Sequence, residues 1–329
     1  ENASNPWGGT GSLTEEQVGA NNLMWEKAKK FDVGMDLHLF KDKFTLTLDY
    51  FKDTRDGIFQ ERKQIPDYVG LIQMPYGNIG RMKSWGADGN MEFYQQIGKD
   101  AHVILRSNFT LSKNKILNWE DTKKPYTYLE NNGYANNVQR GFVAMGLFKD
   151  QQDVEMSPTQ FGTVRPGDIK YRDINGDGKI TYSGVPQLMY GIGAEFRYKS
   201  WTLNVLFKGT GRNKFLYGGS DGRNFDGYMP FNQKDKGNIM TIAYNPENRW
   251  ISAEYSGNQA TENPNARFPR LYYGKNENNT KPSTFWMGDA RYLRLQELSL
   301  AYNLKVPALQ RILGINSMNI QLMCENLAV

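Results

Sequence analysis

The chain has 329 residues with a single cysteine, 13% aromatic residues and a net charge of +5. One cysteine excludes an intrachain disulfide framework, and the basic residues are dispersed without an RNA-binding motif, so we expect no nucleic acid partner. No apolar run approaches the ~18 residues that a membrane-spanning helix requires, so the chain could cross a membrane only as a closed barrel of strands.

Alternating polarity predicts a first pair of strands at 31–40 and 43–52, joined by a tight turn. Side chains alternate across a strand. The apolar residues of the first strand, from Phe31 to Leu39, therefore share one face, while polar residues such as Asp36 share the other.

The same pattern predicts three more pairs: 82–97 with 100–112, 188–198 with 201–211, and 291–303 with 316–327. Much longer polar segments separate the pairs: 53–81, 113–187 and 212–290. Short connections at one end of the strands and long ones at the other are typical of outer-membrane barrels. Eight strands can close a barrel, but the chain begins in a long loop and ends after an upward strand, which indicates part of a larger barrel.

We therefore predict an all-β fold that is part of a large antiparallel transmembrane β-barrel, with long extracellular loops and short periplasmic turns. The apolar strand faces would contact the lipid bilayer, and the polar faces would line an aqueous lumen of mixed charge. The lumen-facing residues would include Asp36, Asp49, Arg106, Glu195, Arg197 and Lys208. The alternative is a soluble or surface-attached all-β protein that binds a glycan or peptide and packs its apolar faces sheet on sheet.

The segment DINGDGKI (173–180) has the chemistry of a calcium-binding loop, with side-chain oxygens at the first, third and fifth positions and a glycine at the sixth. The bidentate Glu of the full motif is absent, because its position falls on Gly184. The open alternative is an Asn/Asp/Gly turn held by bonds between side chains and backbone. The predicted ligands are Asp173, Asn175, Asp177, the backbone of Lys179 and, borrowed from nearby, Asp168.

Aromatic residues are frequent in the long loops. Their faces could stack on a sugar or a peptide, although loop packing or an aromatic girdle at the membrane interface would use the same residues. Binding residues gather on loops that a rigid scaffold holds. The candidates for substrate contact are Trp250, Tyr255, Tyr272, Tyr273, Phe285 and Trp286.

No motif of a serine hydrolase, zinc protease, P-loop protein or cysteine–histidine enzyme is present. His38 and His102 fall on polar faces of different strand pairs, too isolated for a metal site. A secreted hydrolase would need two loop carboxylates, such as Asp153 and Glu155, at the separation that a glycosidase uses. We therefore predict that the protein is not an enzyme.

Four segments form a further pattern along the chain. They are NNLMWEKAKKFDVGMDLHLFKDKFTLTLDYF (21–51), RPGDIKYRDINGDGKIT (165–181), DARYLRLQELSLAYNLKVP (289–307) and CENL (324–327). In this order and spacing they resemble the SusC/RagA-type TonB-dependent transporters of Bacteroidota, and the resemblance spans nearly the whole chain.

The resemblance implies that residues 1–329 are the C-terminal portion of a TonB-dependent receptor β-barrel in the cell outer membrane, without the plug and TonB box. It also implies import of a nutrient, which we expect to be an oligosaccharide or a peptide. The implied partners are a SusD-like lipoprotein and the TonB–ExbB–ExbD complex, the latter acting through the N-terminal part. Apart from possible Ca²⁺, no cofactor is expected.

Overall fold

The fold is mostly β in the computed structural model. The residues that it describes are 18–20, 22–136, 138–172, 179–217, 245–272, 276–305, 310–312 and 314–329. None of the helices in these ranges is long and apolar enough to cross a membrane.

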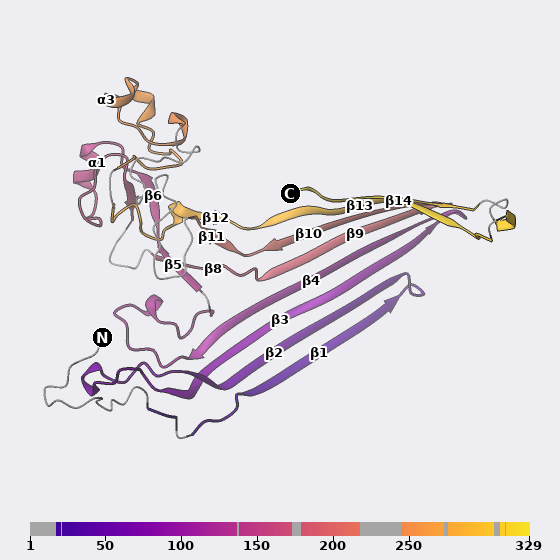
Figure 1. Cartoon of the computed structure of the whole chain (residues 1–329), viewed down its shortest axis with the longest axis horizontal. Coiled ribbons are helices and arrows are strands. Elements are labelled where there is room, and N and C mark those ends of the chain that lie inside the picture. The colour runs from indigo at the N-terminus through magenta and orange to yellow at the C-terminus, as the bar shows by residue number, and fades with distance from the viewer. Residues whose placement is uncertain are drawn as a thin grey trace, which may run out of the picture. The chain divides into compact units, whose positions relative to one another are not determined.

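In the described part of the chain, eight strands form one large sheet in the order β1-β2-β3-β4-β9-β10-β13-β14 (Figure 1). Each strand therefore neighbours the previous long strand of the chain. The strands are β1 (Lys27–Leu39), β2 (Phe44–Glu61), β3 (Tyr76–Ile97), β4 (Ala101–Asn118), β9 (Leu188–Tyr198), β10 (Trp201–Gly211), β13 (Tyr292–Leu304) and β14 (Met318–Ala328). The prediction of four strand pairs is confirmed.

Two of the four pairs are longer than predicted. The strands β2 and β3 extend to Glu61 and from Tyr76, so their connection covers 62–75 rather than 53–81. Similarly, β4 continues to Asn118. The reason is that backbone pairing continues where the alternation of apolar and polar residues has stopped, as in KDTRDG (52–57) of β2. Hydrophobic periodicity marks only the stretch of a strand that has one apolar face.

The chain divides into two compact units. The first comprises Glu1–Leu37, Leu46–Gly89 and Leu111–Asn136, and the second comprises His38–Thr45, Asn90–Thr110 and Asn137–Val329. In the first unit, Arg62 and Glu120 form an ion pair of 2.8 Å between the ends of β2 and β4. Gly86 of β3 leaves room for its neighbours, since a Cβ there would lie 2.1 Å from the carbonyl oxygen of Leu111.

In the second unit, the register aligns apolar residues across four antiparallel strands. Leu203 of β10 faces Phe196 of β9 and Leu300 of β13, and Leu300 in turn faces Leu322 of β14. All four side chains are exposed, and Leu322 has the largest exposed fraction of the four, 69%. We call this set the apolar row; a row of this kind is what a lipid-facing barrel surface presents.

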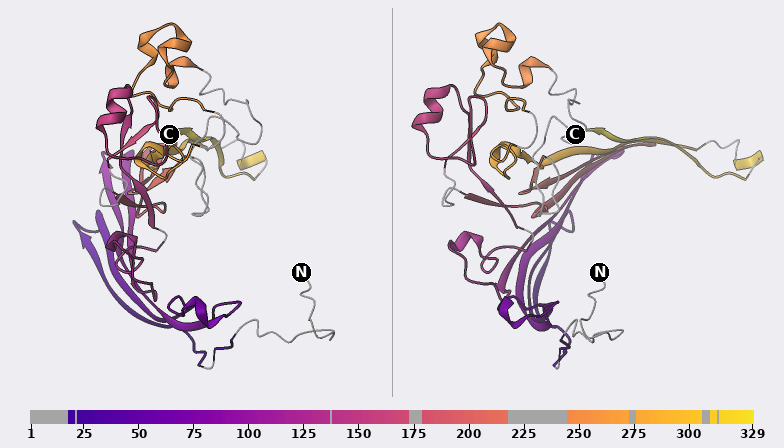
Figure 2. Two further views of the ribbon diagram at one scale, coloured as in Figure 1. Left: turned by 90° about the vertical axis from the view of Figure 1, so that its left-hand side faces the viewer. Right: turned by 60° about the vertical axis from the view of Figure 1, so that its left-hand side comes forward.

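The long connections of the second unit carry short elements of their own (Figures 1 and 2). In the described residues, β5 pairs with β8, β6 with β7 and β11 with β12. The strands are β5 (Val138–Phe142), β6 (Ala144–Leu147), β7 (Ile169–Tyr171), β8 (Lys179–Ser183), β11 (Lys214–Leu216) and β12 (Met287–Asp289). The helical turns are α1 (Gln151–Met156), η4 (Pro246–Asn248), α3 (Ala253–Ser256), η5 (Gln259–Thr261) and η6 (Thr284–Trp286). The first unit adds η1 (Asp67–Val69) and η2 (Thr127–Leu129).

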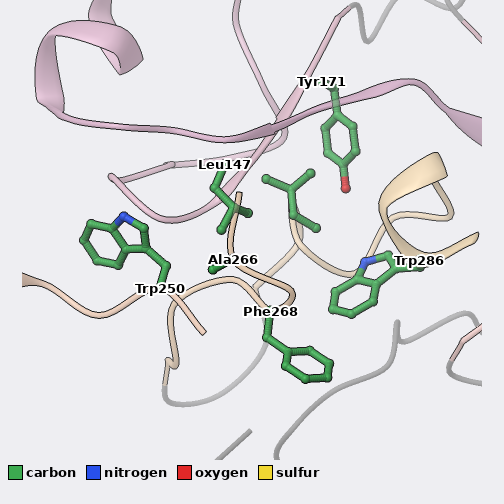
Figure 3. Close-up of a cluster of buried hydrophobic side chains, with 7 residues drawn as sticks. Leu147, Tyr171, Trp250, Ala266, Phe268 and Trp286 are labelled. Carbon is green, nitrogen blue, oxygen red and sulfur yellow. The ribbon is translucent and has the colours of Figure 1, made fainter. Parts of the chain in front are cut away.

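These short elements enclose a hydrophobic cluster, which we call the loop core. Figure 3 shows how its side chains gather from separate segments of the chain. Its members are Leu147, Ile169, Tyr171, Trp250, Ala266, Phe268 and Trp286. The described parts of these connections are therefore folded structure, which supplies a framework for the candidate site.

Candidate functional site

A buried carboxylate joins two distant segments of the long loops. Asp168 has no exposed surface. Its Oδ1 accepts hydrogen bonds from the side-chain amides of Asn279 at 2.9 Å and Asn276 at 3.1 Å. Its Oδ2 accepts from the backbone N–H of Arg165 at 2.9 Å and from Nη2 of Arg270 at 3.0 Å. Both oxygens are thus satisfied by the protein's own donors, as a buried carboxylate requires.

This arrangement bears on the predicted calcium loop. Asp173, Asn175 and Asp177 lie outside the described residues, and Lys179 is the first residue of β8. Asp168 could join a calcium ion only by giving up hydrogen bonds that it already accepts. Among the described residues, no group of three or more His, Cys, Asp or Glu is placed to hold a metal ion. Calcium binding by this loop therefore stays a prediction.

The aromatic candidates separate into packed and accessible residues. Trp286 is 2% exposed, and its indole N–H donates to the backbone oxygen of Asn279 at 2.8 Å. Phe285 packs against the loop core. The geometry of both residues supports packing, since Trp286 is almost fully enclosed and Phe285 is partly buried against the cluster. Tyr255, in contrast, is 84% exposed.

The accessible candidates line two hollows. Tyr255 lines a hollow of about 960 Å³, which we call the loop cleft, and the lining also includes the buried Trp250. Tyr272 lines a smaller one of about 480 Å³. Tyr273 lies outside the described residues. Substrate contact by any of these residues remains a prediction.

The loop cleft is bounded by three segments that lie far apart in the sequence, around residues 149–151, 246–262 and 270–271, together with Arg165 and Pro166. Its charged lining contains both signs. The basic residues are Lys149, Arg165, Arg249 and Arg270, and the acidic residues are Asp150, Glu254 and Glu262. Arg165 and Arg270 also line the smaller hollow, so the two hollows share a wall.

Gly167 allows the wall of the cleft to form. Its φ of +82° is in the left-handed region, and a Cβ at this position would lie 2.3 Å from Cε3 of Trp250. A side chain here would therefore strain the backbone and displace the indole ring. The Gly-Asp pair of the RPGD segment has two separate tasks: Gly167 receives the ring of Trp250, and Asp168 binds Arg270.

Two of the basic side chains of the cleft, Arg270 and Arg249, differ in their partners. The Nε atom of Arg270 is 2.9 Å from Oδ1 of Asp168, so its charge is compensated. Arg249 is half-buried, and burial lowers the pKa of its guanidinium. Its Nε is enclosed and has no hydrogen-bond partner among the described atoms. The same holds for the indole nitrogen of Trp250.

Sequence reasoning missed the residues that organise this region, namely Arg249, Arg270, Asn276, Asn278 and Asn279. Segment 276–280 reads NENNT, a composition that signals a turn. Nothing in that composition indicates that Asn279 meets Asp168, which is 111 positions earlier in the chain. An arginine in a polar loop likewise gives no sign that it will lack an acidic partner.

The carboxylates that a hydrolase would need have structural partners. Asp153 accepts a hydrogen bond from Nζ of Lys170 at 2.7 Å, and Glu155 accepts one from Gln151 at 3.1 Å. On the polar face of the long strands of the second unit, Arg106 pairs with Glu92 at 2.9 Å. Arg106, one of the predicted lumen-facing residues, is therefore paired locally.

Comparison with known proteins decides the family. The family model described as TonB dependent receptor-like, beta-barrel matches residues 2–327. The chain belongs to this family. TonB-dependent receptors are outer-membrane transport proteins and not enzymes, so the large sheet is part of an outer-membrane barrel, as predicted. The alternative of a soluble sheet-on-sheet protein is thereby set aside.

Curated relatives cover most of the chain but match only a part of their own length. TonB-dependent receptor P26 of Formosa agariphila is 25% identical over 307 residues, which cover 87% of this chain and 28% of that protein. TonB-dependent receptor P3 of the same organism is 24% identical over 208 residues, which cover 57% of this chain and 20% of that protein. TonB-dependent receptor SusC of Bacteroides thetaiotaomicron is 23% identical over 318 residues, covering 92% and 28%.

Solved structures show the same fold. The RagAB peptide importer in the open-open state has a TM-score of 0.63 and 20% identity, and the match covers 93% of this chain and 31% of that chain. The RagAB peptide transporter has the same TM-score of 0.63 at 18% identity, and the match covers 92% of this chain and 31% of that chain. The resemblance to the SusC/RagA type is therefore confirmed, and the chain spans less than a third of each of the relatives and structures named here.

Proposed function

We propose that the complete protein imports a nutrient across the outer membrane by TonB-dependent transport. The observation that carries this proposal is the family match over residues 2–327, together with an apolar row that is exposed in the second unit. In a barrel that row contacts lipid, while the polar strand faces border the path of the solute. The chain would be the C-terminal portion of the barrel, and the plug and TonB box would lie elsewhere in the protein.

The solute in this proposal is an oligosaccharide or a peptide. Peptide import is named for the RagAB structures, whose fold this chain shares. The loop cleft of about 960 Å³ is at the upper end of the ~300–1,000 Å³ that ligand pockets occupy, which suits a ligand of this size. We further propose a SusD-like lipoprotein as partner, and coupling to TonB–ExbB–ExbD through parts of the protein outside this chain.

Calcium is a separate proposal. The chain between β7 and β8 carries the Asp173, Asn175 and Asp177 pattern, and hard oxygen donors of this kind suit Ca²⁺. Bound calcium would order the connection between these two strands. Calorimetric titration of the complete receptor with CaCl₂ tests this, and Asp173→Asn combined with Asp177→Asn should abolish the binding signal.

The transport proposal is tested by deleting the receptor in its native bacterium. Uptake of defined peptide and oligosaccharide mixtures is then measured, and a strain that lacks functional TonB is measured in parallel. We expect both strains to lose uptake of the same solute, and the complete receptor to restore it in the deletion strain. Uptake of every solute at the parental rate without the receptor would contradict the proposal.

A further inference from the structure

One cation of the loop cleft, Arg249, lacks a counter-ion among the residues that the structure describes. Arg249 is half-buried, and in the described residues no ion pair joins it to any carboxylate. Arg270, on the same cleft wall, does have a counter-ion, because buried Asp168 compensates its charge. A partly desolvated charge without a partner costs free energy, so folded proteins pair most charges that they enclose.

The acidic residues of the cleft do not supply the missing partner. Oε1 of Glu262 accepts from the backbone N–H of Ala253 at 2.8 Å, and its Oε2 accepts from Gln259 at 3.1 Å. Oδ1 of Asp150 caps α1 by accepting from the N–H of Asp153 at 2.8 Å. These hydrogen bonds hold the carboxylates within their own turns. Glu262 and Asp150 are therefore engaged locally. Glu254, the third acid of the lining, is exposed, and among the described residues no ion pair joins it to Arg249, so the guanidinium of Arg249 remains uncompensated there.

Among the described residues that line the cleft, the enclosed side-chain atoms without a hydrogen-bond partner are all donors. Arg249 and Trp250 both line this cleft, and the enclosed Nε of Arg249 and indole nitrogen of Trp250 have no acceptor among the described atoms. Arg165 adds a second, exposed guanidinium to the lining, and no ion pair is formed by its side chain in the described residues. Guanidinium and indole N–H groups donate and cannot accept. Such a lining is complementary to a ligand group that is anionic and rich in acceptors.

We propose that the loop cleft binds a carboxylate group of the imported ligand, with Arg249 as its anchor and Arg165 as a second cation. This deepens the proposed function and rests on it. Peptides and oligosaccharides carry negative charge chiefly as carboxylates, and the planar guanidinium fork matches a carboxylate with two parallel hydrogen bonds. The carboxylate could be the C-terminus of a peptide or the acid of a uronic sugar. Tyr255, at the exposed rim, is placed to contact the neighbouring part of the ligand.

The test uses the complete receptor, purified with its lipoprotein partner, and two pairs of probes. One pair is tetra-alanine with a free C-terminal carboxylate and its C-terminal amide. The other is trigalacturonate and its fully methyl-esterified form. Calorimetry should show that the acid of one pair binds at least roughly tenfold more tightly than its uncharged counterpart, as expected for a charge-assisted hydrogen bond. The pair that shows the preference identifies the source of the carboxylate.

Substitutions then assign the preference to the anchor. Arg249→Gln should weaken binding of the acid roughly 10- to 100-fold and leave the uncharged probe unchanged. Arg249→Lys should restore part of the loss, because it returns the charge without the fork. Arg267→Gln is the matched control, because Arg267 is exposed on the same segment and does not line the cleft.

A purely structural role for Arg249 is distinguished by stability. Since its cation is uncompensated, Arg249→Gln should leave the unfolding temperature of the receptor unchanged or raised, while binding is lost. Equal binding of acid and uncharged probes by the wild type, including no binding of any probe, would overturn the proposal. So would an acid preference that survives Arg249→Gln.

Failure of this inference is separable from failure of the transport proposal. Receptor-dependent uptake with no preference for the acid probes would contradict only the proposal of a carboxylate site. An acid preference in vitro, with uptake that does not require the receptor, would sink the transport proposal and leave the site standing.

Discussion

The long strands and the loop core of the second unit place their apolar residues in opposite surroundings. Leu300 and Leu322 of the apolar row are exposed, whereas Trp286 and Phe268 of the loop core are 2% and 3% exposed. The strands can leave their apolar face uncovered because lipid covers it in a barrel. In a barrel, irregular loops are excluded from the lipid-exposed hydrocarbon region, so loops of this kind must build an interior of their own, as a water-soluble domain does.

The two regions also satisfy their backbone polar groups differently. In the strands, regular ladders such as β9 with β10 do so. In the loops, side chains take over part of this role. Asn279 accepts from the N–H of Ile169 at 2.9 Å, Asn278 donates to the carbonyl of Ile169 at 2.6 Å, and Gln160 accepts from the N–H of Tyr171 at 2.9 Å. Irregular buried backbone therefore needs specific amides, whereas a ladder tolerates many side chains.

The largest expected effect is from Asp168→Ala. Removing this buried carboxylate leaves Arg270 without its counter-ion and removes hydrogen bonds to two asparagines, so we expect a loss of about 3–5 kcal/mol for the loop core. Limited proteolysis of the complete receptor should cleave the long loops, while the barrel keeps its heat-dependent mobility shift on gels. Simultaneous loss of the barrel would show that the two regions are not independent.

The next largest effect is expected when a charge is introduced into the apolar row. Leu300→Arg should destabilise the barrel by about 2–4 kcal/mol if the position is near the bilayer centre, and by less nearer an interface. The control is Met156→Arg in α1, where the side chain is 78% exposed to water. The measurement is the amount of folded receptor in the outer membrane. Equal assembly of both variants would break the contrast between lipid-facing and water-facing apolar residues.

A smaller effect is expected from Trp286→Phe. This change keeps an aromatic ring in the loop core but leaves the carbonyl of Asn279 without its donor, at a cost of about 1–3 kcal/mol. Trp201→Phe on β10 is the control, because Trp201 is 48% exposed, and we expect a change within about 0.5 kcal/mol. Thermal unfolding followed by protease sensitivity of the loops measures the difference. The same change in both variants would argue against a loop core that depends on this bond.

The smallest expected effect is a loss of stability at acidic pH, caused by protonation of Asp153. Partial burial raises the pKa of Asp153, but hydrogen bonds from the Lys170 side chain and the Lys149 backbone, together with their charges, outweigh it and leave the pKa below its ordinary value. Because the pKa is lower in the folded state, the carboxylate contributes stability above the ordinary carboxyl pKa, and this is lost as the pH falls through the lowered value. We expect roughly 1 kcal/mol or less for this half-buried pair.

Amide hydrogen exchange of residues 149–157 as a function of pH measures this contribution. Asp153→Asn should remove the acid dependence of these amides. Unchanged dependence in the variant would assign it to another group.

The sequence alone determined the strand pairs and the family. Alternating polarity located residues 188–198 and 201–211, which are the bounds of β9 and β10. Alternation is a local property, since each strand residue points to one of two faces regardless of its distant partners. The four family-like segments likewise lie on or beside elements that local sequence sets.

Only the tertiary structure decided the candidate site. Asp168 was a predicted calcium ligand, yet its oxygens meet Arg270 and Asn279, which are 102 and 111 positions away. Trp286 and Tyr255 were equivalent in sequence, but one is buried and the other 84% exposed. Nothing in the sequence distinguishes Arg249, because the absence of an acidic partner is a property of the folded cleft. Contacts between irregular loops have no period in the sequence, so the packing of the chain selects which side chains meet.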